Sequence, residues 1–315
     1  MKSSTLQTAL VAITIGMLSS CSPKKIELGP NPFITHMYTA DPSAHVWDDG
    51  RLYVYASHDI DPPRGCDLMD RYHVFSTDNM KDWTDHGEIL NSHQVTWSTQ
   101  PGFMWAPDCA YKDGTYYFYF PHPENENWGW SWQIGVAVSK SPATGFTVLD
   151  KPVQGEGISG HCMIDPCVFV DDDGKAYLFN GGCGRCVMAP LKDNMVELAA
   201  PATEVQGLEN FHEGAWVHKY KGKYYLSYPD NTDGANNMCY AMSESIYGPW
   251  KSMGIFLASG EKGSGTIHGS IVEYKGEWFV FYHNKALSGR DELRSICVEK
   301  LEYNPDGTIK PVKQH

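Results

Sequence analysis

The chain has 315 residues and a formal net charge of −13, from 25 Lys and Arg against 38 Asp and Glu. A chain of this length can bury a sizeable core, as one large domain or two modest ones. The negative balance argues against a nucleic-acid-binding protein, because phosphate contacts need Lys and Arg. Aromatic residues make up 13% of the chain, which argues against disorder and is typical of aromatic-rich β-structure or of a surface that stacks on sugar rings.

An export signal is indicated at the start of the chain. Lys2 supplies a positive charge, and residues 9–18 form an apolar run that is too short to span a bilayer and is typical of a signal peptide. The run ends in Leu18-Ser-Ser-Cys21, which resembles the lipobox of bacterial lipoproteins. The resemblance implies cleavage before Cys21 and acylation of that cysteine. An ordinary signal peptide followed by a chance cysteine is the alternative.

This pattern divides the chain into three segments. We expect a signal peptide over 1–20, a tether containing Pro and Gly over 21–32, and one folded domain over 33–315. The mature protein is expected to be exported and anchored by the lipid on Cys21 to the bacterial outer membrane, on either its periplasmic or its cell-surface face. We further expect a monomer.

Eight of the nine cysteines follow Cys21. Cys162, Cys167, Cys183 and Cys186 form a possible zinc set, but their spacing is irregular and they stand among strand-like segments. A core of this size does not require disulfides even in an oxidising compartment. We therefore expect buried free thiols or one local disulfide.

Five segments of the chain share a turn-and-strand signature. In each, a glycine preceded by Asp or Lys is followed three residues later by an aromatic residue, and a glycine in a two-residue turn predicts a β-hairpin. The spacing between successive glycines runs from 48 to 64 residues. The glycines are Gly50, Gly114, Gly174, Gly222 and Gly276, and the aromatic residues are Tyr53, Tyr117, Tyr177, Tyr225 and Phe279.

A second strand pair follows each of these hairpins, as in residues 238–250. Two hairpins per repeat make a four-stranded antiparallel sheet, and repeated sheets of this kind close radially into a propeller. The sequence therefore predicts an all-β fold, a five-bladed β-propeller with four antiparallel strands per blade. A two-sheet sandwich is the alternative, but it would not need five similar units.

Equivalent positions in the five repeats carry three acids. The residues nine positions before each turn glycine are Asp41, Trp105, Asp165, Glu213 and Ile267. In a propeller the first strand of each blade lines the axis, so these positions converge at one end of the channel. Clustered carboxylates repel one another and are costly to bury. Two functional interpretations are open: oxygen ligands for calcium, or acid/base catalysis.

Motifs around these acids resemble those of glycoside hydrolase family 43. The similarity extends over residues 33–312, and the family is a five-bladed propeller that hydrolyses glycosidic bonds with inversion. The three acid motifs are Ala40-Asp41-Pro42, Met163-Ile-Asp165-Pro166 and His212-Glu213-Gly214, and two further motifs are Trp105-Ala-Pro-Asp108 and His268-Gly-Ser270.

The resemblance implies a role for each acid. Asp41 would be the general base that activates water, and Glu213 the general acid that protonates the leaving oxygen. Asp165 would raise the pKa of that acid and orient it. Such an acid works near neutral pH only if its pKa is lifted, and a nearby anion does this.

Further site residues are implied in the same way. Arg294 resembles an arginine that contacts the sugar, and His268 would face a metal ion in the axial channel, usually calcium with mostly water ligands. Phe33 and Trp105 are candidate platforms for the substrate ring. The aromatic loop Asn125–Trp132 is expected to wall one side of the pocket.

The implied activity is an exported glycosidase that acts on plant-type polysaccharide or oligosaccharide and releases L-arabinofuranose or D-xylose, with α-L-arabinofuranosidase preferred over β-xylosidase. A non-catalytic sugar-binding propeller is one alternative, but it should lack one of the acids. An endo-acting xylanase or arabinanase and a galactose- or galactofuranose-releasing enzyme are others. The related fructan-cleaving propellers retain configuration and usually carry Arg where this chain has Ile164.

Overall fold

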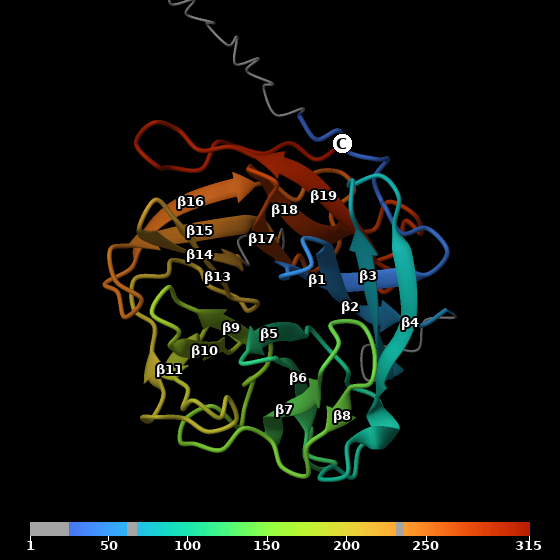
Figure 1. Cartoon of the computed structure of the whole chain (residues 1–315), viewed down its shortest axis with the longest axis vertical. Coiled ribbons are helices and arrows are strands. Elements are labelled where there is room, and N and C mark those ends of the chain that lie inside the picture. The colour runs from blue at the N-terminus through green and yellow to red at the C-terminus, as the bar shows by residue number, and fades with distance from the viewer. Residues whose placement is uncertain (1–24, 62–67, 231–235) are drawn as a thin grey trace, which may run out of the picture.

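Five antiparallel sheets stand around a common axis and follow one another in chain order (Figure 1). The computed structural model describes residues 25–61, 68–230 and 236–315. The expected signal peptide, Cys21 and Cys66 therefore lie outside the described residues. Within these ranges no helix is long and apolar enough to cross a membrane. The predicted all-β, five-bladed propeller is confirmed.

Blades one to three each contain four strands. Their bounds are β1 (Tyr38–Val46), β2 (Leu52–Asp59), β3 (Arg71–Thr77) and β4 (Thr84–Asn91), followed by the short 3-10 helix η2 (Ser92–Gln94); then β5 (Asp108–Lys112), β6 (Thr115–Pro123), β7 (Trp132–Ser139) and β8 (Thr147–Val148); then β9 (Cys167–Val170), β10 (Ala176–Asn180), β11 (Val187–Pro190) and β12 (Thr203–Glu204).

Blade four also has four strands, whereas blade five has three in the described chain. Their bounds are β13 (Trp216–Tyr220), β14 (Lys223–Pro229), β15 (Met238–Ser243) and β16 (Lys251–Leu257) for blade four, and β17 (Gly269–Tyr274), β18 (Glu277–Asn284) and β19 (Ser295–Leu301) for blade five. The prediction of four strands per blade is therefore wrong for blade five.

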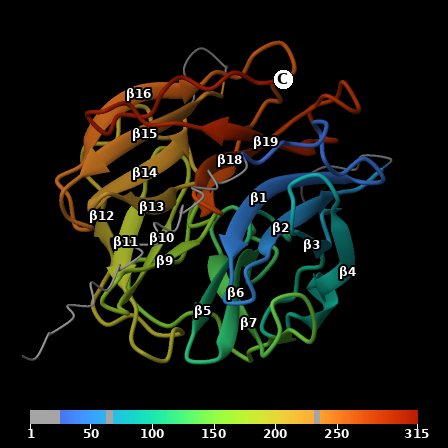
Figure 2. The same ribbon diagram turned by 45° about the horizontal axis from the view of Figure 1, so that its top comes forward.

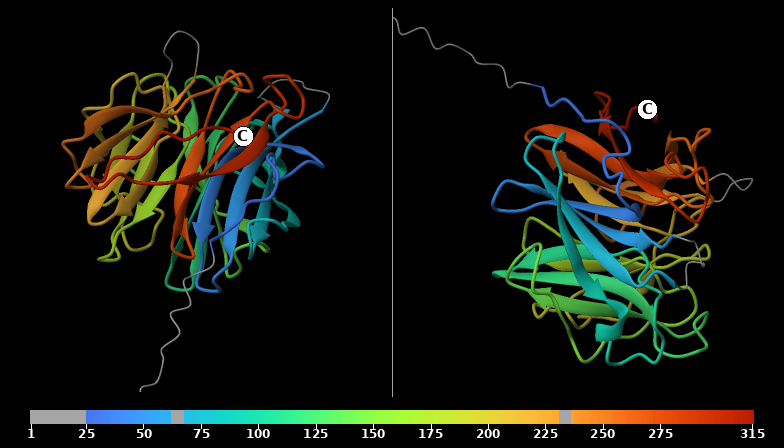
Figure 3. Two further views of the ribbon diagram at one scale, coloured as in Figure 1. Left: turned by 90° about the horizontal axis from the view of Figure 1, so that it is seen from above. Right: turned by 90° about the vertical axis from the view of Figure 1, so that its right-hand side faces the viewer.

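The first strand of each blade lies nearest the axis, and later strands lie toward the rim (Figure 2). The strands run between the two faces of the molecule, as the side views show (Figure 3). Each sheet packs between two neighbours, so both faces of its central strands are buried and aromatic rings fill the space between blades. Tyr72 of blade one, for example, meets Phe118 of blade two at 5.0 Å between ring centroids.

The five turn glycines all have positive φ, between 76° and 82°, as the hairpin signature requires. Three of the turns have two residues, because Lys112 pairs directly with Thr115, Tyr220 with Lys223 and Tyr274 with Glu277. The turns at Gly50 and Gly174 are longer. There the N–H of the glycine bonds the carbonyl three residues earlier, at 2.9 Å and 2.8 Å.

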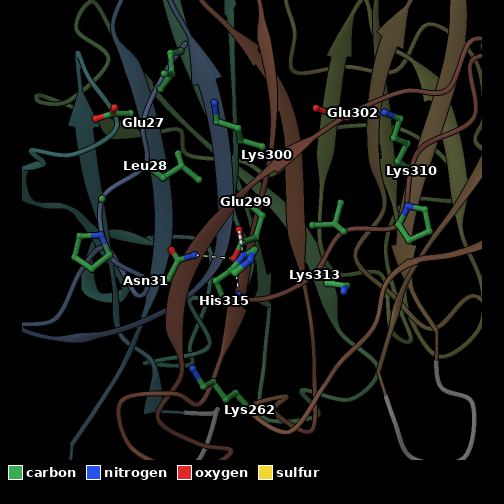
Figure 4. A pocket seen from close by; sticks show the side chains of 15 residues that line it. Glu27, Leu28, Asn31, Lys262, Glu299, Lys300, Glu302, Lys310, Lys313 and His315 are labelled. Atoms are coloured by element: carbon green, nitrogen blue, oxygen red, sulfur yellow. Dashed lines mark hydrogen bonds and ion pairs between the residues drawn. The ribbon is translucent and has the colours of Figure 1, made fainter.

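The outer edge of blade five is covered by the segment around Asn31. The Asn31 side chain accepts a hydrogen bond from the Val298 N–H at 2.9 Å and donates to the Val298 carbonyl at 2.8 Å. It thereby occupies the two backbone groups that a fourth strand would pair, and this is why β19 can end the blade. The carboxylate of Glu299, which is 5% exposed, takes hydrogen bonds from Asn31 and from His315 (Figure 4).

The blades close through side chains of the axial strands. Strand β1 packs against β17, and the Ser270 hydroxyl on β17 donates to the Pro42 carbonyl at 2.7 Å and accepts from the Ala44 N–H at 3.0 Å. Blade one is thereby fixed to blade five although more than two hundred residues separate them in sequence. This joint determines where the start of β1 lies at the channel mouth.

Candidate active site

The three acids singled out in the sequence line one cavity of about 200 Å³. Asp41 lies in the first half of the axial strand β1, and Asp165 and Glu213 stand just before the axial strands β9 and β13. Of the seven predicted site residues, all except Phe33 line this cavity. Its walls are Asp41, Met69, Trp105, Ala106, Ile164, Asp165, Glu213, Thr266, His268 and Arg294.

Asp41 reaches the cavity from a β-bulge. Ala40 pairs with Ser57 but Ser43 pairs with Tyr55, so the strand register shifts across Asp41. The backbone of Asp41 has a φ of 54°, in a left-handed region that Asp tolerates better than most residues and that is characteristic of functional sites. The bulge releases the Asp41 N–H from the sheet and turns its side chain toward the axis.

The released N–H of Asp41 is bound by His283 of β18. His283 Nδ1 accepts it at 3.0 Å, and Nε2 of the same ring lies 2.9 Å from the Thr266 carbonyl, to which it donates. Burial lowers the pKa of His283 to about 4, with the Arg294 charge adding to the effect. The ring is therefore neutral near pH 7, which is the form that can accept at one nitrogen and donate at the other.

The Asp41 carboxylate is held in its ionised form. The Ser57 hydroxyl donates to Oδ2, and Arg294 Nη1 lies 3.2 Å from Oδ1. Burial by itself raises the pKa of this carboxyl, but Arg294, two neighbouring imidazoles and Ser57 lower it by more, so the pKa of Asp41 is about 2. Asp41 can therefore accept a proton at neutral pH.

Arg294 is itself fixed by a second buried acid, Asp59. Its Nε and Nη2 donate to the two Asp59 oxygens at 2.9 Å and 2.8 Å, and its backbone N–H donates to Oδ2 at 2.7 Å. Asp59 is 3% exposed. Two parallel bonds in this geometry orient the planar guanidinium, and the remaining nitrogen Nη1 is directed toward Asp41.

Asp165 and Glu213 lie in surroundings that raise the pKa of a carboxyl group, whereas those of Asp41 lower it. Asp165 has a φ of 53° and is 4% exposed, and the Glu213 side chain is one-fifth exposed. Burial raises the pKa of both carboxyls, and the negative charges of Glu213 and Asp41 raise that of Asp165 further. The two groups titrate as a pair, and their repulsion favours keeping a proton between them.

One loop ties the backbones of this pair together. The N–H of Gly181 donates to the carbonyl of Ile164 at 2.8 Å, and the N–H of Gly184 donates to the carbonyl of His212 at 3.0 Å. Ile164 precedes Asp165 and His212 precedes Glu213, so the loop at 181–184 bonds both chain segments that carry the acids. A disulfide between Cys162 and Cys183 fixes the same loop.

This disulfide settles part of the cysteine prediction. Five other cysteines in the described chain are buried free thiols, so the expectation of free thiols or one local disulfide is confirmed for these residues. The zinc set is not formed, because Cys162 and Cys183 are bonded to each other while Cys167 and Cys186 are buried thiols. Burial raises the pKa of both thiols, which disfavours the thiolate form that binds metal.

Of the two aromatic residues predicted to contact the substrate ring, one lines the cavity and the other does not. Trp105 lines the cavity, where its ring lies 4.4 Å from that of Trp132. Phe33 does not line it: its ring stacks on Trp83 at 4.1 Å and meets Phe281 edge-on at 5.8 Å. Those contacts join blades one and five. Phe33 therefore has a packing role between the blades and is not a substrate platform of this cavity. An aromatic residue before the first strand can serve either purpose, and its sequence position does not distinguish them.

In blade five, the residue nine positions before the turn glycine does not line the cavity. Ile267 is 2% exposed and belongs to the hydrophobic core between blades, while its neighbours Thr266 and His268 line the cavity. The carboxylate of Asp108, from the motif that begins at Trp105, is already occupied by hydrogen bonds from the protein. It accepts from Ser43, His45 and the N–H groups of Cys109 and Val168.

His268 lies in the cavity wall beside Asp41. Its Nδ1 is 3.8 Å from Asp41 Oδ1, and burial lowers its pKa although Asp41 and Asp108 oppose this. A neutral imidazole next to a carboxylate suits a cation that keeps water as its other ligands. Among the described residues, His161, Cys162 and Cys183 are close enough together to hold an ion, but the two cysteines are bonded to each other. No group of three potential ligand residues surrounds His268 in the described chain.

Two residues that bond the Asp41 side chain or backbone were not predicted from the axial positions of the repeat. Ser57 and His283, which both bond Asp41, stand seven residues after the turn glycines Gly50 and Gly276. Applying the repeat register to the second strand of each blade would have found both. Asp59 carries no such signal, because an acid at a strand end is usually solvated and only the fold brings Arg294 to it.

Comparison with known proteins agrees with this architecture. The family model for glycosyl hydrolases family 43 matches residues 30–309. Xylosidase/arabinosidase 43A of Humicola insolens is 38% identical over 88% of this chain and 98% of its own length. A β-xylosidase of Xylanibacter ruminicola is 33% identical over 88% of this chain and 97% of its own length.

A solved structure shows the same arrangement of blades. CoXyl43, a family 43 β-xylosidase/α-arabinofuranosidase from a compost microbial metagenome, was crystallised with xylotriose in a calcium-free form. It superposes with a TM-score of 0.80 at 36% identity, covering 92% of this chain and 98% of its own. Given a family match that spans the whole propeller, this chain belongs to glycosyl hydrolases family 43.

Proposed function

We propose that this protein is an inverting glycosidase that removes single D-xylose or L-arabinofuranose units from xylo- and arabino-oligosaccharides. The observation that carries the proposal is one cavity in which a carboxylate with a lowered pKa faces a carboxyl pair with raised pKa values. Carboxyl groups whose pKa values are pushed apart are the requirement for separate base and acid roles. The relatives named above support the choice of sugars.

Asp41 is assigned as the general base. Its ionised carboxylate would take a proton from a water molecule as that water attacks the anomeric carbon. Arg294 and Ser57 hold the carboxylate in place. The electron pair of the glycosidic bond leaves on the oxygen of the departing sugar.

Glu213 is assigned as the general acid that protonates this departing oxygen. Asp165 keeps the proton available by disfavouring a second negative charge nearby. Attack by water on one face of the ring and departure from the other gives a product of inverted configuration.

The size of the cavity favours one sugar unit at a time. About 200 Å³ is less than the roughly 300–1,000 Å³ of sites that enclose drug-sized ligands. A pentose ring fits such a space, while a longer glycan must continue outside it. We therefore favour release of terminal or side-chain units over cleavage within a polymer.

Calcium and membrane attachment belong to the proposal as well. We assign His268 as the residue that would hold a Ca²⁺ ion through an imidazole nitrogen, with water as the remaining ligands; the ion would supply positive charge near the acids. We also propose export as a monomer anchored to the outer membrane by a lipid on Cys21. Fractionation of cells that express Cys21→Ser tests the anchor, since that variant should move from membrane to soluble fractions.

The activity is tested with aryl glycosides. The purified protein should hydrolyse p-nitrophenyl β-D-xyloside or α-L-arabinofuranoside in preference to the galactoside and galactofuranoside. Proton NMR of the first product should show the inverted anomer. A product of retained configuration would overturn the assignment of Asp41 as a base.

A further inference from the structure

A pair of exposed tryptophans lies next to the catalytic cavity, in the loop between β6 and β7. Trp128 is 46% exposed and Trp130 is 65% exposed. Five large hydrophobic side chains of the described chain are at least 39% exposed, and this loop holds two of them. Large exposed apolar groups that gather in one place indicate a binding surface.

The rings continue the wall of the cavity. Trp105, which lines the cavity, lies 4.4 Å from Trp132 and 6.2 Å from Trp128 between ring centroids. Trp128 also contacts the buried ring of Phe103 at 5.6 Å. An unbroken set of aromatic contacts therefore leads from the cavity to solvent.

Trp130 extends this surface toward blade three. Its ring stacks on His161 at 4.2 Å with an angle of 29° between the planes. His161 precedes Cys162, which the disulfide to Cys183 anchors, and the N–H of Gly160 donates to the Trp132 carbonyl at 2.8 Å. The surface is thus made by two blades that are bonded to each other at this point.

The loop holds its tryptophans in place before any ligand binds. The Glu124 N–H donates to the Ser131 carbonyl and the Trp130 N–H to the Asn127 carbonyl, each at 2.9 Å. The Asn127 N–H is bound by the side chain of Asn125 at 3.0 Å. A surface ordered in advance loses less entropy on binding.

We propose that Trp128, Trp130 and His161 form an aromatic ledge that binds the sugar units beyond the cleaved bond. A pyranose ring has an apolar face of C–H groups that packs on an indole, and hydroxyl groups at its edge that stay in water. The occupant is a β-linked, xylan-type chain, because such a chain is extended and flat enough to lie on these rings as it leaves the cavity. This inference rests on the proposed function, which places the terminal unit in the cavity.

The test compares substrates of different length. With Trp128→Ala and Trp130→Ala, KM for xylotriose and xylotetraose should rise by about tenfold, the size of one lost aromatic contact. For p-nitrophenyl xyloside KM should rise less than for xylotetraose, because its single aryl group covers less of the ledge than three sugar units do. Trp130→Phe should retain most of the affinity for the longer substrates.

Tyr247→Ala is the matched control, since this ring is 63% exposed but contacts Tyr177 in blade three, away from the cavity wall. It should leave all substrates unchanged. Equal KM values of the tryptophan variants and the parent enzyme on xylotetraose would overturn the ledge.

Calorimetry separates this inference from the proposed function. In the Glu213→Gln background, affinity should grow from xylobiose to xylotetraose, and the two tryptophan substitutions should remove that growth. Affinity that does not grow with chain length would overturn the ledge even if the enzyme cleaves xylosides. Growth that depends on the tryptophans, in a protein that hydrolyses no aryl xyloside or arabinofuranoside, would leave the ledge standing and refute the proposed reaction.

Discussion

Arg294 and Asp59 form a buried, two-bonded ion pair directly behind the catalytic cavity, with N–O distances of 2.9 Å and 2.8 Å. Asp59 is at the end of β2 and Arg294 just before β19, so the pair joins the first and last blades. It also fixes the nitrogen that reaches Asp41 at 3.2 Å. One ion pair therefore serves both the closure of the ring and the ionisation of the proposed base.

Asp59→Asn should destabilise the protein strongly. Removing one partner of a buried pair leaves the other charge poorly compensated, which typically costs about 3–5 kcal/mol in the free energy of unfolding. Urea denaturation measures this loss. Asp70→Asn is the control, because Asp70 forms the same two-bonded geometry with Arg71 at a partly exposed site and should cost less than about 1 kcal/mol. Equal losses in the two variants would contradict a special role for the buried pair.

Glu213→Gln should reduce kcat at least about a hundredfold, since the variant cannot protonate the leaving oxygen. The side chain keeps its size, so the thermal melting curve should match that of the parent. Glu209→Gln removes a nearby exposed carboxylate and should leave kcat unchanged. Near-normal turnover of Glu213→Gln would mean that another group is the acid.

Asp165→Asn should move the basic limb of the activity profile to lower pH. The charge of Glu213 raises the pKa of Asp165, and because repulsion between two carboxylates is mutual, removing the Asp165 charge should lower the pKa of Glu213, so that its proton is lost earlier as pH rises. A full pH profile of kcat measures the shift, with Asp173→Asn in an exposed turn as the control. A basic limb that stays in place or moves upward would show that Asp165 does not tune Glu213.

Breaking the Cys162–Cys183 disulfide should lower kcat more than it changes KM. The loop that it fixes bonds the carbonyls of Ile164 and His212, so added motion there misplaces both acids, and roughly a tenfold fall is expected. Dithiothreitol should have this effect on the parent enzyme. The Cys162→Ser, Cys183→Ser double variant should start at the lower rate and not respond to the reductant. If reduction leaves the parent rate intact, the disulfide does not position the acids.

His218 should make stability depend on pH. It is 5% exposed, its Nε2 lies 2.8 Å from the Tyr303 hydroxyl, and burial lowers its pKa from 6.5 to about 3. The folded-state pKa is below the unfolded one, so the stabilising contribution is full above pH 6.5 and is lost as pH falls toward 3. The slope from this single group is about 1.4 kcal/mol per pH unit.

Urea titrations between pH 6 and pH 4 should therefore give a flatter stability profile for His218→Gln than for the parent protein. His93→Gln, at an exposed position, should keep the parent slope. Parallel profiles for parent and His218→Gln would show that this imidazole is not held neutral in the fold.

The repeat made much of the fold predictable. Asp-Gly and Lys-Gly turns at regular spacing give hairpins from local backbone preference alone, and five of them give five blades. The missing fourth strand of blade five was not predictable, because the backbone groups of Val298 are paired by the side chain of Asn31. No local pattern distinguishes that asparagine from one in a simple tether.

The sequence alone determined the blade number and which acids meet, since equivalent positions of a repeat must converge on a common axis. Only the tertiary structure determined the protonation states of these carboxyl groups. Asp41 is ionised because Arg294 and Ser57 come to it from distant parts of the chain, and the Asp165–Glu213 pair retains a proton because burial and mutual repulsion disfavour two negative charges there. Charge interactions depend on distance and on exclusion of water, and both are properties of the folded chain and not of the order of its residues.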